Sequence, residues 1–339
     1  MTPAPHKEPA HPQARPAMAE AHIEDLSYRP YEGPYRTRLL RWWVIAGAWM
    51  RVVRRQPAFW ACVAVSMWPY ARAIFFLYLD SNGMLRRPPG TPDVGLMLGI
   101  ADHTPGQQFA FQLYGALTSQ WFLWMLPVAL IAGAGSIALD NRAGALMLYL
   151  SKPVSKAEYL LGKWAGIFVL LAGATLAPQF FLYGYCALSY SGEGFFRNEP
   201  LLVVRIVAAS LVPAAVHAAL LIGFSAWSRT SRMAGAVYAG FYFVVSIAAQ
   251  MVWRLLYHGH LGQGDLVRHL HVHGIIEGVV QNIFGVTIHT ITGNRRMGIE
   301  YVTLPPPSLE IVGGLCLFLM VAAIIAARYR VQAVEVLRG

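Results

Sequence analysis

The chain has few charged residues and very few cysteines for its length. Charged residues make up 13% of its 339 residues and three are cysteine, whereas 56% are hydrophobic. A soluble core of this length does not hide so much apolar side chain, so an ordinary soluble fold is excluded and lipid is the expected solvent. Since Cys62, Cys186 and Cys316 all lie inside apolar runs, we expect neither a disulfide nor a cysteine metal site.

The sequence also lacks the short motifs of nucleotide binding and of hydrolysis. No Gly-x-x-x-x-Gly-Lys-[Ser/Thr] phosphate loop occurs, so the chain does not bind ATP by that route. Gly-x-Ser-x-Gly and His-Glu-x-x-His are absent, and no paired-carboxylate pattern stands out. We therefore expect no enzyme, no catalytic residue and no cofactor in this chain, and nucleotide-driven work must come from a partner.

The basic balance of the chain, a net charge of +10, follows the apolar runs rather than a soluble module. Lys and Arg flank these runs, as they do on the inner side of a membrane with anionic lipids. A membrane-lipid contact is therefore predicted, and a nucleic-acid partner is not.

Six apolar runs are long enough to cross a hydrocarbon core, which needs about 20 residues in a helix. Helix is required because an open strand edge would leave backbone groups unpaired in lipid. The fold class predicted is therefore all-α integral membrane, with six transmembrane helices. The predicted spans are 58–79, 115–139, 159–188, 201–227, 233–257 and 308–327.

Two segments precede the first span. Residues 1–34 are rich in Pro, Ala and His and predict a disordered tail without a removable signal peptide. Within 35–56, Trp and Arg recur at helical spacing, which is typical of an amphipathic helix in the headgroup layer. The alternative is a cytosolic amphipathic helix packed on another protein. Residues 35–339 are expected to form the membrane domain.

The distribution of basic residues predicts the orientation. The positive-inside rule places both termini in the cytoplasm. The segment 140–158 then lies inside, and 80–114 and 258–307 form outer loops. Apolar residues in the second outer loop predict one or two short helices near the outer headgroups or capping the bundle.

Histidines are the candidate polar ligands. His269, His271 and His273 alternate, so a strand would place them on one face, and a helix would bring His269 over His273. A divalent metal would need further ligands held by a second shell, so the alternative is surface or interfacial histidine. His217 lies near the middle of its span beside Pro213, where it faces a substrate path or bonds to a neighbouring helix.

The inner segment 140–158 contains local helix signals. A short helix over 144–150 would stop at Lys152-Pro153. Ser155 followed by Glu158 has the pattern of an N-terminal capping box for the third span. The alternative is a plain basic turn on the inner side.

The same segment resembles the second-to-third helix turn of the permease subunits of ABC-2 type ABC transporters. In that family an acidic residue, Gly and a Leu-rich run precede a Ser-x-Pro motif, which Glu, Tyr and Leu-Leu-Gly-Lys follow. The matching positions are Asp140, Gly144, 146–150, Ser151, Pro153, Ser155, Glu158, Tyr159 and 160–163, with Asp where Glu is frequent.

The resemblance implies a non-catalytic permease that couples to two cytoplasmic ATPase subunits, which bind the ATP and Mg. It implies a second copy of this chain or a similar permease, and a bacterial inner-membrane location. An extracytoplasmic accessory protein is a further candidate partner. The expected coupling residues are Asp140, Asn141, Arg142, Gly144, Leu146, Ser151, Pro153, Ser155 and Glu158.

Scarce charge at the middle of the spans favours export or extraction of an apolar or amphipathic substrate. One alternative is an ATP-driven energy transducer that acts on an extracytoplasmic partner without bulk transport. Another is a channel or carrier outside the ABC class.

Overall fold

The computed structural model is mostly helical, and every residue that it describes lies in one unit, residues 40–339. The described residues are 41–82, 84, 105–145, 154–193, 195, 200–257, 265–292, 300–304 and 306–331.

Six helical segments are long and apolar enough to cross a membrane, which confirms the predicted number. The second begins before its predicted start, because apolar residues carry α5 back into the segment predicted as an outer loop. The six are Pro57–Leu79, Phe109–Arg142, Lys156–Ser189, Leu202–Trp227, Ser231–Tyr257 and Leu309–Arg330.

The first span consists of two helices, α2 (Pro57–Ser66) and α3 (Trp68–Ser81). They meet at Met67, whose backbone amide turns back to the carbonyl of Ala64 at 3.2 Å. Pro69 follows, and its ring nitrogen cannot donate the hydrogen bond that would continue α2. The first span is therefore interrupted at this proline.

The second span is interrupted twice. A π-helical turn, η1 (Gln120–Trp124), separates α5 (Pro105–Ser119) from α6 (Met125–Gly133), and a turn over 134–137 separates α6 from α7 (Ala138–Arg142). A π turn and the proline at 127 leave carbonyl groups without helical partners. The Tyr242 hydroxyl donates to two such oxygens, those of Trp121 and Phe122, at 3.2 Å each.

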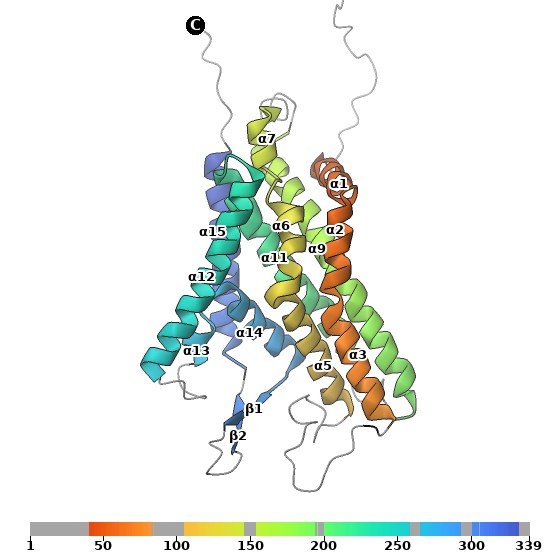
Figure 1. Ribbon diagram of the computed structural model, residues 1–339. Helices are drawn as coiled ribbons and strands as arrows, with labels where there is room; N and C mark the ends of the chain where they lie inside the picture. The colour runs from red at the N-terminus through yellow and green to blue at the C-terminus, as the bar shows by residue number, and fades with distance from the viewer. Residues whose placement is uncertain are drawn as a thin grey trace, which may run out of the picture. The chain divides into compact units, whose positions relative to one another are not determined.

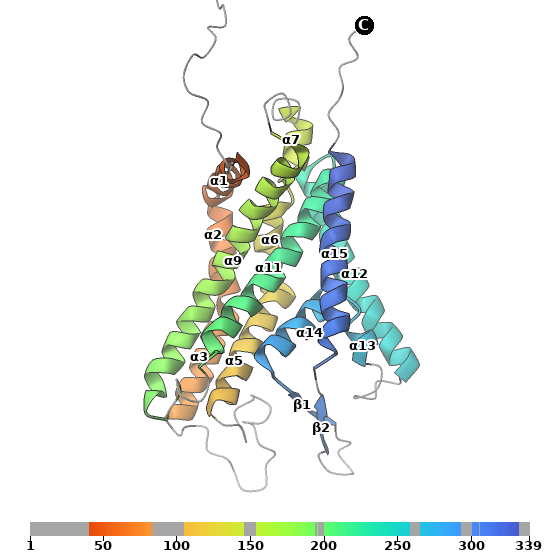
Figure 2. The same ribbon diagram turned by 180° about the vertical axis from the view of Figure 1, so that it is seen from behind.

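The other spans are α9 (Lys156–Ser189), α11 (Leu202–Trp227), α12 (Ser231–Tyr257) and α15 (Leu309–Arg330). Figures 1 and 2 show α9 and α11 running side by side, with α15 against α11. Most of α11 is buried, whereas α12 and α15 expose long apolar faces. Such faces are what lipid or another membrane chain would cover.

Helix α1 (Arg41–Arg54) packs on α9 through small residues. A Cβ atom on Gly162 would lie only 2.6 Å from the backbone oxygen of Trp42, and one on Gly166 would lie 3.1 Å from that of Ala46. The two glycines therefore allow the backbones to approach closely. One side of α1 is buried against the bundle, and the exposed side carries Trp43.

Between α12 and α15 the chain forms α13 (Asp265–Arg268), α14 (Val272–Phe284) and an antiparallel hairpin. The predicted short helices are present, and α14 packs on α11 and α15. The hairpin strands β1 (Ile288–Thr292) and β2 (Glu300–Leu304) were not predicted. Their β-branched and aromatic residues favour extended backbone, which explains the departure from a purely helical fold.

Candidate functional site

The candidate site lies where the second span breaks before α7, at the end of the bundle that also contains α1 (Figure 1). The break at 134–137 exposes backbone groups that need partners. Ser225 of α11 supplies them. Its hydroxyl accepts from the amides of Ile137 and Ala138 at 3.0 Å each and donates to the carbonyl of Ala134 at 2.9 Å. Ser225 is fully buried, so α11 holds the break together.

Asp140 joins α7 to α9. Its Oδ2 atom lies 2.7 Å from Nζ of Lys163 and accepts a hydrogen bond of 2.7 Å from the Tyr159 hydroxyl. The Lys163 side chain is 3% exposed and that of Asp140 is 15% exposed. Removing one partner of such a pair leaves a charge in a water-poor environment. The pair therefore fixes the position of α7 against the start of α9.

Lys163 also connects this pair to α1. Its Nζ lies 4.6 Å from the centroid of the Trp49 ring, within the range of a cation–π interaction. The Trp49 indole nitrogen in turn donates to the carbonyl of Ala132, at 2.8 Å, just before the break. Displacement of α7 would thus act on three helices: α1, α9 and α11.

The next two residues of α7 differ in their surroundings. The Asn141 amide donates to the carbonyl of Ala226 at 3.3 Å, a second link to α11. Arg142 is exposed. It is the residue of this pair that a docking protein can reach without disturbing the contacts of α7.

The predicted capping box is confirmed. The Ser155 amide donates to Glu158 Oε2 at 2.8 Å, the Glu158 amide donates to Ser155 Oγ at 3.1 Å, and α9 begins at Lys156. Both residues are exposed at this end of α9. They fix where the third span begins.

The prediction of a helix that starts at Gly144 is wrong at that residue. Gly144 has φ 64°, a left-handed conformation that glycine adopts without a Cβ penalty, and it follows the end of α7. Gly144 therefore ends a helix. Leu146, Ser151 and Pro153 lie outside the described residues.

Sequence reasoning missed Ser225 and Trp49, and it quoted Tyr159 and Lys163 only as part of a motif. One signal was available for Lys163. A lysine inside an apolar span is costly unless it is paired, so an acidic partner on a neighbouring helix was to be sought. Nothing comparable in the sequence marks Ser225, because serine is common in such spans.

His217 lies in the bundle interior, 1% exposed. Its ring stacks on Trp121 with centroids 4.6 Å apart, and Nδ1 is hydrogen-bonded to the Tyr238 hydroxyl of α12. This contact is the hydrogen bond to a neighbouring helix that the sequence allowed. The geometry supports a structural role over a substrate path.

The three alternating histidines are all buried where α14 meets α12. His271 caps α14, since its Nδ1 accepts from the Gly274 amide at 3.1 Å, and the same atom lies 3.2 Å from Ser246 Oγ. His273 Nε2 lies 4.0 Å from a Glu277 oxygen. Among the described residues no three His, Cys, Asp or Glu side chains come together to hold a metal. The interfacial interpretation thus fits better than the metal site.

Comparison with known proteins supplies the family. Residues 43–276 match the model of the ABC-2 family transporter proteins, a segment that starts in α1, includes the whole site around Asp140 and ends in α14. No curated protein matches the chain. Since the match covers more than half of the 339 residues, the resemblance of the segment 140–163 is confirmed, and the chain belongs to the ABC-2 family of transporter membrane proteins.

Proposed function

We propose that the chain is the permease subunit of an ATP-binding cassette transporter and that α7 with the start of α9 is its coupling element. Two partner ATPase subunits would bind ATP and Mg and dock on the segment 140–158. A second copy of this chain or a similar permease would complete the membrane part. The described contacts bear on the coupling element, and the family supports the rest.

The observation that carries this proposal is the set of links around α7. A short exposed helix is tied to α9 by the Asp140–Lys163 pair and to α11 by Ser225 and Asn141. A force on such a helix is transmitted because hydrogen bonds and packed side chains connect it to the spans. A plain basic turn would need none of these links.

The proposed orientation follows from charge. The end of the bundle with α7 carries exposed Arg142 and Arg229, which suits the cytoplasmic side of a bacterial inner membrane, and both termini would lie on that side. Helix α1 would then lie at the inner headgroups, with the exposed Trp43 toward lipid.

The proposed substrate is apolar or amphipathic and is exported or extracted from the membrane. Buried polar groups in the spans, such as Gln120 and His217, already have protein partners, which disfavours a strongly polar cargo. Energy transduction to an extracytoplasmic partner without transport remains the second candidate, because α14 and the hairpin present an ordered surface at the opposite end (Figure 2). Transport by vesicles that contain the ATPase distinguishes the two.

The test of coupling is the charge reversal Arg142→Glu. Asp140 is unsuitable, because changing it leaves buried Lys163 without its partner. The expected result is about tenfold weaker ATPase association, as for loss of a central charged contact at an interface. Arg229→Glu, an exposed arginine between α11 and α12, is the matched control. Co-purification in mild detergent is the measurement.

Equal ATPase recovery with Arg142→Glu and with the unaltered chain would contradict a role of α7 in docking. Absence of any ATPase partner from the unaltered chain would instead favour the channel or carrier alternative.

A further inference from the structure

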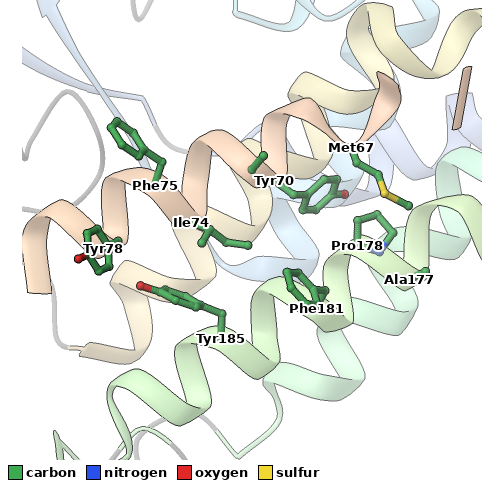
Figure 3. Close-up of a pocket in the computed structure, with 10 residues that line it drawn as sticks. Met67, Tyr70, Ile74, Phe75, Tyr78, Ala177, Pro178, Phe181 and Tyr185 are labelled. Atoms are coloured by element: carbon green, nitrogen blue, oxygen red, sulfur yellow. The ribbon is translucent and has the colours of Figure 1, made fainter. Parts of the chain in front are cut away.

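A groove of about 770 Å³ lies between α3 and α9, away from the site around Asp140. Figure 3 shows its two walls, one from each helix. Its volume falls within the range of small-molecule sites, roughly 300–1,000 Å³. The side chains that face one another across it are Tyr70, Ile74 and Tyr78 on α3, and Pro178, Phe181 and Tyr185 on α9.

Hydrogen bonds behind the groove fix its inner wall. Pro178 has no amide hydrogen, so the carbonyl of Ala174 lacks its usual helical partner. The Gln120 amide approaches that carbonyl at 3.4 Å, and the Tyr70 hydroxyl donates to Gln120 Oε1 at 2.9 Å. The Tyr70 hydroxyl thus points into the bundle and leaves its ring as an apolar wall. The groove is therefore a built feature of the kink in α9.

The groove is polar at one end only. Met67 and Pro178 lie at one end, and Tyr78 and Tyr185 lie together at the other, near the last residues of α3 and α9 (Figure 3). Neither of these two tyrosine hydroxyls has a hydrogen-bond partner within the part of the chain that the structure describes. Tyrosine near the end of a span is typical of the headgroup level of a membrane.

The length of the groove matches one leaflet. From Met67 to Tyr78 the rise of α3 is about 16 Å, and from Ala177 to Tyr185 the rise of α9 is about 12 Å. Half of a hydrocarbon core is about 15 Å. An occupant that extends from the tyrosines to Met67 thus needs one polar end and one apolar chain of leaflet depth.

We propose that this groove binds an acyl chain of a membrane phospholipid, with the headgroup beside the hydroxyls of Tyr78 and Tyr185. The chain lies along Ile74 and Phe181 and ends near Pro178. This site goes beyond the proposed function, because it is a claim about binding that holds whether or not a lipid is the cargo.

The test uses the full chain in nanodiscs of phosphatidylethanolamine and phosphatidylglycerol. The probe is a phosphatidylethanolamine with a photoreactive diazirine in the middle of its acyl chain, and labelled peptides are mapped by mass spectrometry. We expect label on α3 and α9 to saturate as the probe fraction rises. Label on the exposed face of α12, around Val244 and Ile247, should rise in proportion to the probe.

Two filling variants test the site. Ala177→Trp on α9 and Ala71→Trp on α3 both alter exposed positions that line the groove, so neither disturbs the buried core. Each should reduce α3 and α9 labelling about tenfold at low probe, which corresponds to excluding roughly two methylene groups. Val244→Trp on α12 is the control and should leave it unchanged.

Labelling of α3 and α9 that rises in proportion to the probe, as on α12, would overturn the proposal. So would retention of full labelling in either filling variant. No ATPase is needed, so failure here is separate from failure of the coupling proposal.

Discussion

Lys163 of α9 places its ammonium nitrogen 2.7 Å from a carboxylate oxygen of Asp140 in α7, so two nearly buried charges join the broken second span to the third. Asp140→Asn and Lys163→Met should each destabilise the chain by about 2–4 kcal/mol, because each leaves one charge with little water. The double variant should recover part of that loss. Thermal unfolding in detergent measures all three.

A double variant that loses as much stability as the two single variants together would show that the pair is not coupled. The Tyr159 hydroxyl stays in place in every variant and keeps one hydrogen bond available to position 140.

Ser225→Ala should loosen the break before α7. The amides of Ile137 and Ala138 and the carbonyl of Ala134 would lose their buried partner, at a cost of about 1–3 kcal/mol. Ser228→Ala is the control, since that hydroxyl bonds only to the carbonyl of Phe224 one turn earlier in the chain. Hydrogen exchange over 134–142 is the measurement. Faster exchange in the control alone would contradict the assignment.

Gly162→Ala should separate α1 from α9. The added methyl group would lie 2.6 Å from the Trp42 backbone oxygen, and such overpacking costs about 1–3 kcal/mol. Gly173→Ala on the same helix meets nothing within 4 Å and should be neutral or stabilising. Thermal unfolding compares them. Equal stability of the two variants would show that α1 does not depend on this close approach.

The length of the apolar runs determined the six spans in advance, and the four-residue pattern at Ser155 and Glu158 determined where α9 begins. Both signals are local in sequence. The contacts of Ser225 with Ile137 join residues 88 apart, and no periodicity identifies such partners. The hairpin was missed because β-branched residues are common in spans as well as in strands.

Acid should destabilise the chain partly through His273. Burial lowers the pKa of this histidine, with the Glu277 carboxylate opposing and His269 adding to the effect. Because the folded pKa lies below the ordinary value of 6.5, the unfolded chain takes up the proton first. This contribution is complete above pH 6.5 and is lost as pH falls below it.

The variant His273→Gln should therefore lose less stability than the unaltered chain between about pH 7.5 and about pH 5.5. Glu277→Gln removes the opposing carboxylate and should lose more. Unfolding temperatures at the two pH values decide the matter. Identical pH dependence of all three proteins would rule out a contribution from His273.

The π turn at Gln120–Trp124 makes the number of residues in the second span as important as their identity. Each helical residue turns the chain by about 100°. Deleting one residue here would restore a regular helix, yet it would rotate all that follows relative to α5. Asp140 would then face away from Lys163. Insertions and deletions between 120 and 140 should therefore be tolerated far less well than substitutions.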